Sequence, residues 1–533
     1  MKVVFRVDAS VRMGTGHLMR CLTLAEALRQ RGADIRFVCR AHAGHVIDTL
    51  THAAIPVAVL PTPIKAAGAA EDYAAWLGVT QHADAAETIE AIKSDKPDWL
   101  IVDHYGLDAQ WEQVLRPHAG KLMVIDDLAN RPHGCDVLLD QNFWTDAETR
   151  YQNLVPTGCR CLLGPRYALL RPEYAAFRKT LTPRDGHVRR VLVFFGGSDL
   201  ANVAGRALEA LSTPELRELQ VDVVAGANNP HRKTIEQQVS QRPRTTLHEP
   251  RPHLADLMAQ ADVALGAGGA TTWERLCLGL PSLVVSMAEN QIPVCESLAE
   301  SRLINYLGPV STLQIERIRR GVLAMVNDAQ ALMELSFRGR TLVDGLGAQR
   351  LAELIDPTSS EQLRLRPAQQ EDAALYFGWV NETEVRRQSI NRDPIPWQVH
   401  QEWFRGKLAD PRCRLLVLEA GTLPVGQIRF DIDHDEARID YSLDTLVRGR
   451  HWAAKLIAMG VCMVRDSVPA TLCAEVKEAN QASCAVFSRL GFTTQASSSP
   501  GMRVFRSQSS RIAATGVANI CQAALLSTGS KQG

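Results

Sequence analysis

The sequence lacks the long apolar runs and the charge imbalance that are typical of membrane proteins and nucleic-acid-binding proteins. No stretch of the 533 residues approaches the ~20 apolar residues of a transmembrane helix. The opening MKVVFRVDAS lacks the apolar run that follows the lysine of a signal peptide. Lys and Arg total 59, as do Asp and Glu, so the formal net charge is zero. We therefore expect a cytoplasmic protein with neither a membrane nor a nucleic acid as partner.

Patterns for metal binding and for disulfide bonds are also missing. The 12 cysteines are scattered, and only Cys159 and Cys161 are close neighbours, without a second pair or nearby histidines. In the first two-thirds of the chain no metal-ligand cluster such as a DxD motif stands out. The adjacent Asp126 and Asp127 are the nearest candidate, but such a pair after a strand is more often structural. We expect reduced cysteines and no metal.

The apolar pattern predicts several domains, as the length also suggests. Strand-like apolar runs alternate with helix-like stretches through the first two-thirds of the chain, which indicates parallel sheets covered on both faces. A polar linker and a hairpin-rich unit follow, and the end of the chain is rich in Ser, Ala and Gly, which is typical of disorder. The predicted domains are 1–165, 166–355, the linker 356–362, 363–507 and the disordered tail 508–533.

A histidine lies in a glycine loop between the first predicted strand and the first predicted helix. Gly14, Gly16 and His17 form this loop. A strand, a tight glycine turn and a helix start can bind an anion, but they can equally form an ordinary connection. The loop lacks the full GxGxxG pattern of dinucleotide-binding proteins, and a histidine here is often a cap or a packing residue.

A second glycine loop makes the binding interpretation stronger. Gly266, Gly268 and Gly269 end a predicted strand, and the helix that follows carries Glu274. Backbone amides at a helix start suit a diphosphate, and a carboxylate one turn later can accept hydrogen bonds from ribose hydroxyls. Two α/β domains with such loops predict a nucleotide-sugar site between them.

An ordered series of motifs covers residues 1–350. The motifs are RVDAS, MGTGHLMRCLTLA, DHYGLD, IDDLANRPHGCDVLLDQN, LLGPRYALLRPEY, VLVFFGGSD and GAGGATTWERLCLGLPSLVVSMAENQ. The series resembles the UDP-sugar hydrolases of pseudaminic acid biosynthesis. This resemblance implies a GT-B-like pair of Rossmann-type domains that releases UDP from UDP-2,4-diacetamido-2,4,6-trideoxy-β-L-altropyranose. It also implies that His17 is the base that activates water, a role that suits an imidazole near neutral pH.

The same resemblance implies which residues bind the substrate. The Gly266–Gly269 amides would hold the diphosphate, and the sugar and the uridine would be bound from opposite sides. On the sugar side the resemblance implies Asp8, Gly14, Gly16, Tyr105 and Asn142; on the uridine and ribose side it implies Glu274, Asn290 and Gln291. Asp8 could instead cap a helix, and Tyr105 could simply pack at a strand end.

Residues 363–507 resemble the GNAT N-acetyltransferases, which implies an α+β domain that uses acetyl-CoA. The family's pyrophosphate loop, (Q/R)xxGx(G/A), corresponds to Arg448, Gly449, Arg450, His451, Trp452 and Ala453, and a later motif retains Asn480 and Ser483. Two positions depart from the pattern. His451 stands where glycine is usual, and Phe487 stands where many members have a tyrosine that acts as general acid.

We therefore expect a bifunctional enzyme. The last domain would acetylate a UDP-4-amino-sugar, and the first two would hydrolyse the product to UDP and the free diacetamido sugar. The alternatives are a GT-B glycosyltransferase that uses a UDP-sugar donor, a nucleotide-sugar-binding protein without activity, and a hydrolase whose GNAT domain is degenerate. The sequence leaves the sugar stereochemistry and the oligomeric state open.

Overall fold

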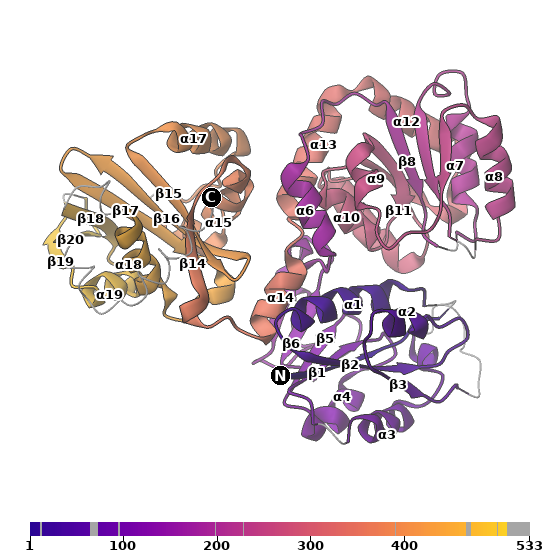
Figure 1. Cartoon of the computed structure of the whole chain (residues 1–533), viewed down its shortest axis with the longest axis horizontal. Coiled ribbons are helices and arrows are strands. Elements are labelled where there is room, and N and C mark those ends of the chain that lie inside the picture. Colours follow the sequence, from indigo (N-terminus) through magenta and orange to yellow (C-terminus); the bar gives the residue numbers. More distant parts are fainter. Residues whose placement is uncertain are drawn as a thin grey trace, which may run out of the picture. The chain divides into compact units, whose positions relative to one another are not determined.

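The chain divides into two compact units, Met1–Asp356 and Pro357–Gly533, in a computed structural model (Figure 1). The structure describes residues 1–10, 13–63, 73–93, 96–197, 199–226, 229–389, 391–464, 471–497 and 499–508. The predicted tail lies outside these residues except for Gln508. Within the described part of the chain, no helix is both long and apolar enough to cross a membrane.

The first half of the first unit is built on a seven-stranded parallel sheet in the order β3-β2-β1-β4-β5-β6-β7. Its central strands are apolar and buried on both faces, as expected for a parallel sheet covered by helices. The strands are β1 (Lys2–Val7), β2 (Asp34–Arg40), β3 (Val57–Leu60), β4 (Trp99–Asp103), β5 (Lys121–Ile125), β6 (Val137–Asp140) and β7 (Arg160–Leu163). The helices are α1 (Gly16–Arg29), α2 (Ile47–His52), α3 (Gln81–Ile92), α4 (Ala109–Leu115) and α5 (Ala147–Arg150).

The second half repeats this architecture with six parallel strands in the order β10-β9-β8-β11-β12-β13. The strands are β8 (Arg190–Phe194), β9 (Gln220–Val224), β10 (Thr245–His248), β11 (Val263–Ala267), β12 (Ser282–Ser286) and β13 (Asn305–Pro309). The helices are α6 (Pro172–Thr180), α7 (Val203–Leu211), α8 (Arg232–Gln241), α9 (Ala255–Gln260), α10 (Thr271–Cys277), α11 (Ile292–Glu300), α12 (Ile315–Asn327) and α13 (Ala329–Leu342).

The last helix of the unit, α14 (Gly347–Ile355), returns to the first half. Its apolar residues, among them Leu351 and Ile355, join the core formed by α1, β1 and β2. Arg31, just after α1, donates to the Glu353 carboxylate at 2.9 Å. The chain thus closes the unit on the sheet where it began, so its two halves are linked by more than a single connection.

The second unit contains a seven-stranded mixed sheet in the order β14-β15-β16-β17-β18-β20-β19. The strands are β14 (Leu363–Pro367), β15 (Cys413–Ala420), β16 (Leu423–Asp433), β17 (Glu436–Leu443), β18 (Thr471–Lys477), β19 (Thr493–Ala496) and β20 (Met502–Gln508). The helices are α15 (Ala373–Val380), α16 (Thr383–Gln388), α17 (Trp397–Ala409), α18 (Trp452–Val464) and α19 (Gln481–Arg489). Every neighbouring pair is antiparallel except β17 and β18, which are parallel. The predicted fold class, two Rossmann-type α/β halves followed by an α+β domain, is confirmed.

Candidate active sites

His17 lies in the first turn of α1, at the carboxyl edge of the first sheet. The preceding turn brings the Gly14 amide to the Ser10 carbonyl at 2.9 Å and holds Gly14 at a φ of 71°, in the region that favours glycine. Thr15 occupies the N-cap position of α1 without a side-chain capping hydrogen bond, and His17 lies two residues further on, inside the helix. The ring is buried, with 9% of the residue exposed.

The partner of His17 is Asp103, at the end of β4. His17 Nδ1 lies 2.6 Å from Asp103 Oδ1. Arg20, one turn further along α1, donates hydrogen bonds to both oxygens of this carboxylate at 2.6 and 2.7 Å. Burial alone would raise the pKa of Asp103, but Arg20 and His17 hold it well below its usual range. An ionised Asp103 accepts the Nδ1 proton, which leaves Nε2 free to act as a base.

Two further residues extend this network across the edge of the sheet. Arg20 reaches the Asp127 carboxylate at 3.1 Å, and the Tyr105 hydroxyl donates to the other Asp127 oxygen at 2.5 Å. The Tyr105 ring stands edge-on to His17, with centroids 4.6 Å apart. The structure thus brings the predicted residues His17 and Tyr105 together, and their partners Asp103, Arg20 and Asp127 were not recognised from the sequence.

Two other predicted sugar-side residues lie at the same edge in different environments. Asp8 follows β1 and is buried, and its carboxylate accepts from Arg6 at 2.6 Å and from the Arg40 amide at 2.7 Å. Asn142 follows β6 and is half-buried, with its amide donated to Asp140 at 2.9 Å. Asp8 does not cap a helix, and the roles of both residues in sugar binding stay predictions.

The glycine loop of the second half differs from its sequence-based interpretation. Gly266 lies inside β11 and pairs with strands on both sides, while the Gly268 amide donates to the Val285 carbonyl at 3.0 Å. The expectation that the Gly268 amide is free for a diphosphate is wrong, because it completes the end of the sheet instead. Gly269 and the residues that begin α10 remain as candidates.

The predicted uridine-side residues lie on two segments after β11 and β12. Gln291 is in a 3₁₀ turn, Glu289–Gln291, together with Asn290, and a Cβ on Gly268 or Gly269 would lie within 3.6 Å of the Gln291 side chain. Glu274, on α10, is half-buried and hydrogen-bonded to Tyr174. Burial raises the pKa of Glu274 to about 7, against the effect of that hydrogen bond.

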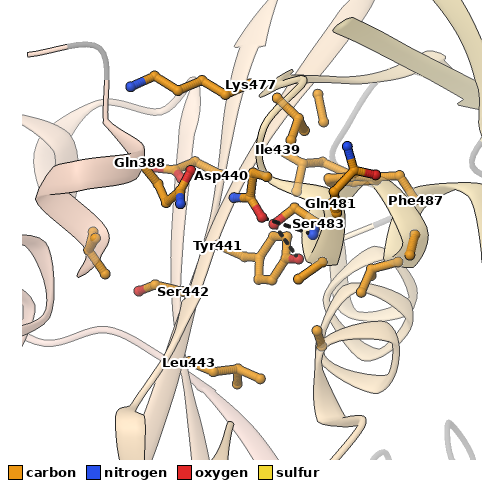
Figure 2. Close-up of a pocket in the computed structure, with 18 of the residues that line it drawn as sticks. Gln388, Ile439, Asp440, Tyr441, Ser442, Leu443, Lys477, Gln481, Ser483 and Phe487 are labelled. Atoms are coloured by element: carbon orange, nitrogen blue, oxygen red, sulfur yellow. Dashed lines mark hydrogen bonds between the residues drawn. The ribbon is translucent and has the colours of Figure 1, made fainter. Parts of the chain in front are cut away.

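The second unit contains a cavity of about 1130 Å³ at the place where two strands separate. β17 and β18 pair only from Glu436 to Arg438, opposite Thr471 to Cys473. Their continuations, from Ile439 to Leu443 and from Ala474 to Lys477, both line the cavity (Figure 2). The backbone N–H and C=O groups along this opening could form hydrogen bonds with the amide groups of an extended ligand.

The predicted pyrophosphate loop borders the cavity. Arg448 donates to Glu382 at 2.7 Å, Gly449 has a φ of 81°, and the Arg450 guanidinium lies 5.1 Å from the Trp452 ring. His451 also has a positive φ, 59°, a conformation that costs a non-glycine residue roughly 1–2 kcal/mol. His451, which stands where glycine is usual, thus has a backbone conformation that favours glycine, and its imidazole is exposed. Trp452 is buried, and Ala453 lines the cavity beside it.

The residues of the later motif meet at the start of α19. Asn480 caps this helix by accepting from the Ser483 amide at 3.1 Å, and Ser483 Oγ accepts from the Tyr441 hydroxyl at 3.1 Å. Phe487 is buried and stacks on Phe505, so it has a core role as well as a place on the cavity wall. Tyr441 was not recognised from the sequence, because it belongs to a strand far from the motif.

The comparisons with known proteins separate the two units. Residues 362–493 match the model of the acetyltransferase (GNAT) domain. The second unit is a GNAT domain. The chain is similar to a spore coat polysaccharide biosynthesis protein, SpsG, of Bacillus subtilis, at 24% identity over 68% of this chain and 100% of that protein.

The chain is also similar to the UDP-2,4-diacetamido-2,4,6-trideoxy-β-L-altropyranose hydrolase of Campylobacter jejuni. The identity is 26%, over 56% of this chain and 97% of that protein. Among solved structures, MurG of Acinetobacter baumannii matches at 15% identity with a TM-score of 0.47, over 67% of this chain and 99% of that chain. The chain therefore joins a region similar to a UDP-sugar hydrolase to a GNAT domain, as the sequence motifs predicted.

Proposed function

We propose that the first unit hydrolyses a UDP-linked diacetamido-trideoxy-hexose to UDP and the free sugar. The observation that carries this proposal is the pairing of His17 with Asp103 at 2.6 Å beside the carboxyl edge of a doubly wound sheet, where such folds bind their ligands. The similarity to the Campylobacter hydrolase supports the substrate class. The Asp103 carboxylate orients the imidazole, so that Nε2 faces the reaction as a base.

The reaction follows from this orientation. His17 Nε2 takes a proton from water while the water oxygen bonds to the anomeric carbon. The bond from that carbon to the diphosphate oxygen breaks, and UDP leaves with the electron pair. Diphosphate is a stable anion and needs little help from an acid, so one base accounts for the chemistry, and general base catalysis is worth ~10²–10⁴-fold.

The remaining substrate contacts are part of the proposal. On the sugar side we propose Asp8, Gly14, Gly16, Tyr105 and Asn142; on the nucleotide side we propose Gly269, Glu274, Asn290 and Gln291. A metal is not required by this scheme. In the described residues, no group of three or more His, Cys, Asp and Glu side chains is arranged to hold a metal ion.

One assay tests the hydrolase proposal against its competitors. Purified full-length protein is incubated with UDP-2,4-diacetamido-2,4,6-trideoxy-β-L-altropyranose alone, and UDP release is followed. We expect release without any added acceptor. A glycosyltransferase would release UDP at a useful rate only after an acceptor is added, and a binding protein would bind UDP without turnover. Either result would overturn the hydrolase proposal.

We propose acetyl transfer from acetyl-CoA as the function of the second unit. The opening between β17 and β18 and the loop from Arg448 to Ala453 support this co-substrate, with the loop amides and the start of α18 around the pyrophosphate. The acceptor that links the two units is UDP-2-acetamido-4-amino-2,4,6-trideoxy-β-L-altropyranose, whose acetylated product is the substrate of the hydrolase. Joining consecutive steps in one chain raises the local concentration of the intermediate.

The charge of the cavity wall favours an anionic acceptor over a polyamine. Six cationic side chains line it against three carboxylates. The cations are Arg386, Arg429, Arg438, Arg448, Lys477 and Arg489, and the carboxylates are Glu384, Asp440 and Glu475. We expect CoA thiol to appear with acetyl-CoA and the UDP-4-amino-sugar, and spermidine to be a poor acceptor. If no amine yields thiol, the GNAT domain is degenerate.

A further inference from the structure

The course of β17 indicates how an acetyl donor would be oriented in the cavity of the GNAT domain. β17 runs from the point where it leaves β18, after Arg438, toward the loop that begins at Arg448. A donor whose pyrophosphate is held at that loop therefore extends back along β17, from Leu443 toward Ile439. These five residues span about 13 Å at ~3.3 Å per residue, so a donor chain that extends along them brings its thioester end beside this strand edge.

Tyr441 stands at this part of the strand. Its hydroxyl donates to Ser483 Oγ at 3.1 Å, and its ring lies edge-on to Phe487 with centroids 5.9 Å apart (Figure 2). The side chain is half-buried and lines the cavity, and it is the one tyrosine among the described residues of the cavity wall. Phe487 has no hydroxyl, so the phenol of this region comes from β17 and not from α19.

The chemistry of the leaving group requires a proton donor here. Breaking a thioester leaves a thiolate, which is released more easily if it is protonated as the bond breaks. The other acidic candidates on the cavity wall are less suitable. Lys477 Nζ is engaged by the carbonyls of Ser389 at 2.6 Å and Arg387 at 3.3 Å, and His451 belongs to the loop at the pyrophosphate end. Serine hydroxyls are much weaker acids than a phenol.

We propose that Tyr441 is the general acid of acetyl transfer, in the place that Phe487 leaves without a hydroxyl. This inference rests on the proposed acetyltransferase function. Burial raises the pKa of Tyr441, against its hydrogen bond to Ser483, so the phenol is protonated at neutral pH and available as a donor.

The step balances without another reactant. The neutral amine of the acceptor attacks the carbonyl carbon of acetyl-CoA and forms the C–N bond. The C–S bond then breaks, and sulfur takes its electron pair and the proton from Tyr441 Oη. The new amide nitrogen releases one proton to the solvent, and the tyrosinate recovers one from the solvent. The products are the N-acetyl sugar and CoA thiol.

The test compares three full-length proteins, the wild type, Tyr441→Phe and Tyr376→Phe, with acetyl-CoA and the UDP-4-amino-sugar as substrates. Tyr441→Phe removes only the hydroxyl. Tyr376→Phe makes the same change at a buried tyrosine of this unit that does not line the cavity and whose hydroxyl donates to the Leu416 carbonyl. We expect kcat for thiol release to fall at least ~10²-fold in Tyr441→Phe, with the KM for acetyl-CoA within about twofold, and to stay near wild type in Tyr376→Phe.

The pH profile separates acid catalysis from a structural role. In the wild type, kcat should fall at high pH as the phenol ionises, and Tyr441→Phe should lack this limb. Binding of CoA, measured by calorimetry, checks that each variant is folded. If kcat of Tyr441→Phe is within threefold of the wild type, the inference about Tyr441 is wrong, while the acetyltransferase proposal still stands. Loss of CoA binding by this variant would also overturn the inference. Absence of thiol release from the wild type would overturn the acetyltransferase proposal, and the inference with it.

Discussion

The two halves of the first unit have the same strand order but opposite chemistry at their carboxyl edges. In the first half, Asp8 follows β1 and Asp103 ends β4, and both carboxylates are buried and paired with arginines. In the second half, β8 and β11 lead into glycines, among them Gly197 and Gly268. The edge of one sheet carries buried charged side chains, and the edge of the other carries glycines, which have no side chain.

This difference indicates a division of labour on a shared architecture. Buried ionised groups with fixed partners can orient a base, because they need no reorganisation during the reaction. Glycines let a ligand or a neighbouring side chain approach the backbone closely, as Cys295 and Gln291 do at Gly268. We therefore assign bond breaking to the first half and nucleotide binding to the second, and the following predictions test this assignment.

Removal of His17 should have the largest effect and should leave binding intact. In His17→Ala, UDP release from the diacetamido UDP-sugar should fall ~10²–10⁴-fold, because the imidazole that Asp103 orients as the base is lost. The affinity for UDP, measured by calorimetry, should change less than about threefold. Equal rates of release in the variant and the wild type would contradict the division of labour.

Asp103→Asn should have a smaller effect on the same reaction. The amide cannot hold the imidazole in its Nδ1–H form as a carboxylate does, so UDP release should fall about 10- to 100-fold. Asp127→Asn is the matched control, because the Asp127 carboxylate accepts from Arg20 and Tyr105, whereas His17 is paired with Asp103. If both variants lose the same activity, the network acts as a whole and Asp103 has no special role.

Local patterns predicted much of the fold but little of the network around His17. The alternation of apolar runs identifies β1, α1 and β4, because each is defined by its own residues. The bond between His17 and Asp103 joins residues 86 positions apart, and only the order of strands in the sheet brings them together. The motif DHYGLD contains Asp103, so a signal was present, but an aspartate at a strand end has many other roles.

The same limit explains what was missed in the GNAT domain and in the glycine loop. Tyr441 meets Ser483 only because β17 and α19 border one cavity. The Gly268 amide is taken by Val285, a residue of the next strand, and no pattern within the loop indicates this. Sequence shows which residues could bind a diphosphate; sheet pairing decides which amides are free.

Substitution of two adjacent glycines should show which of them is required for packing in the second half. A Cβ at Gly268 would lie 2.3 Å from Cys295 Sγ, whereas one at Gly269 would lie 3.6 Å from Gln291, an ordinary contact. Gly268→Ala should therefore lower the free energy of unfolding by about 1–3 kcal/mol, and Gly269→Ala should have little effect on it. Thermal unfolding measures both, and Gly268→Ala with Cys295→Ala should recover part of the loss.

Glu274→Gln should have the smallest effect, visible as a change in how stability depends on pH. Burial raises the pKa of Glu274 to about 7 from the ordinary 4.5, so the folded protein binds more protons than the unfolded chain between these values. Stability from this group is therefore lost as pH rises from about 5 to 8 in the wild type, and glutamine removes that loss. The difference in Tm, variant minus wild type, should increase by about 2–4 °C from pH 5 to 8.

The raised pKa of Asp140 is common to both proteins and cancels in this difference. If the difference in Tm stays the same from pH 5 to 8, burial does not raise the pKa of Glu274 in the folded protein. That result would contradict the electrostatic description of Glu274.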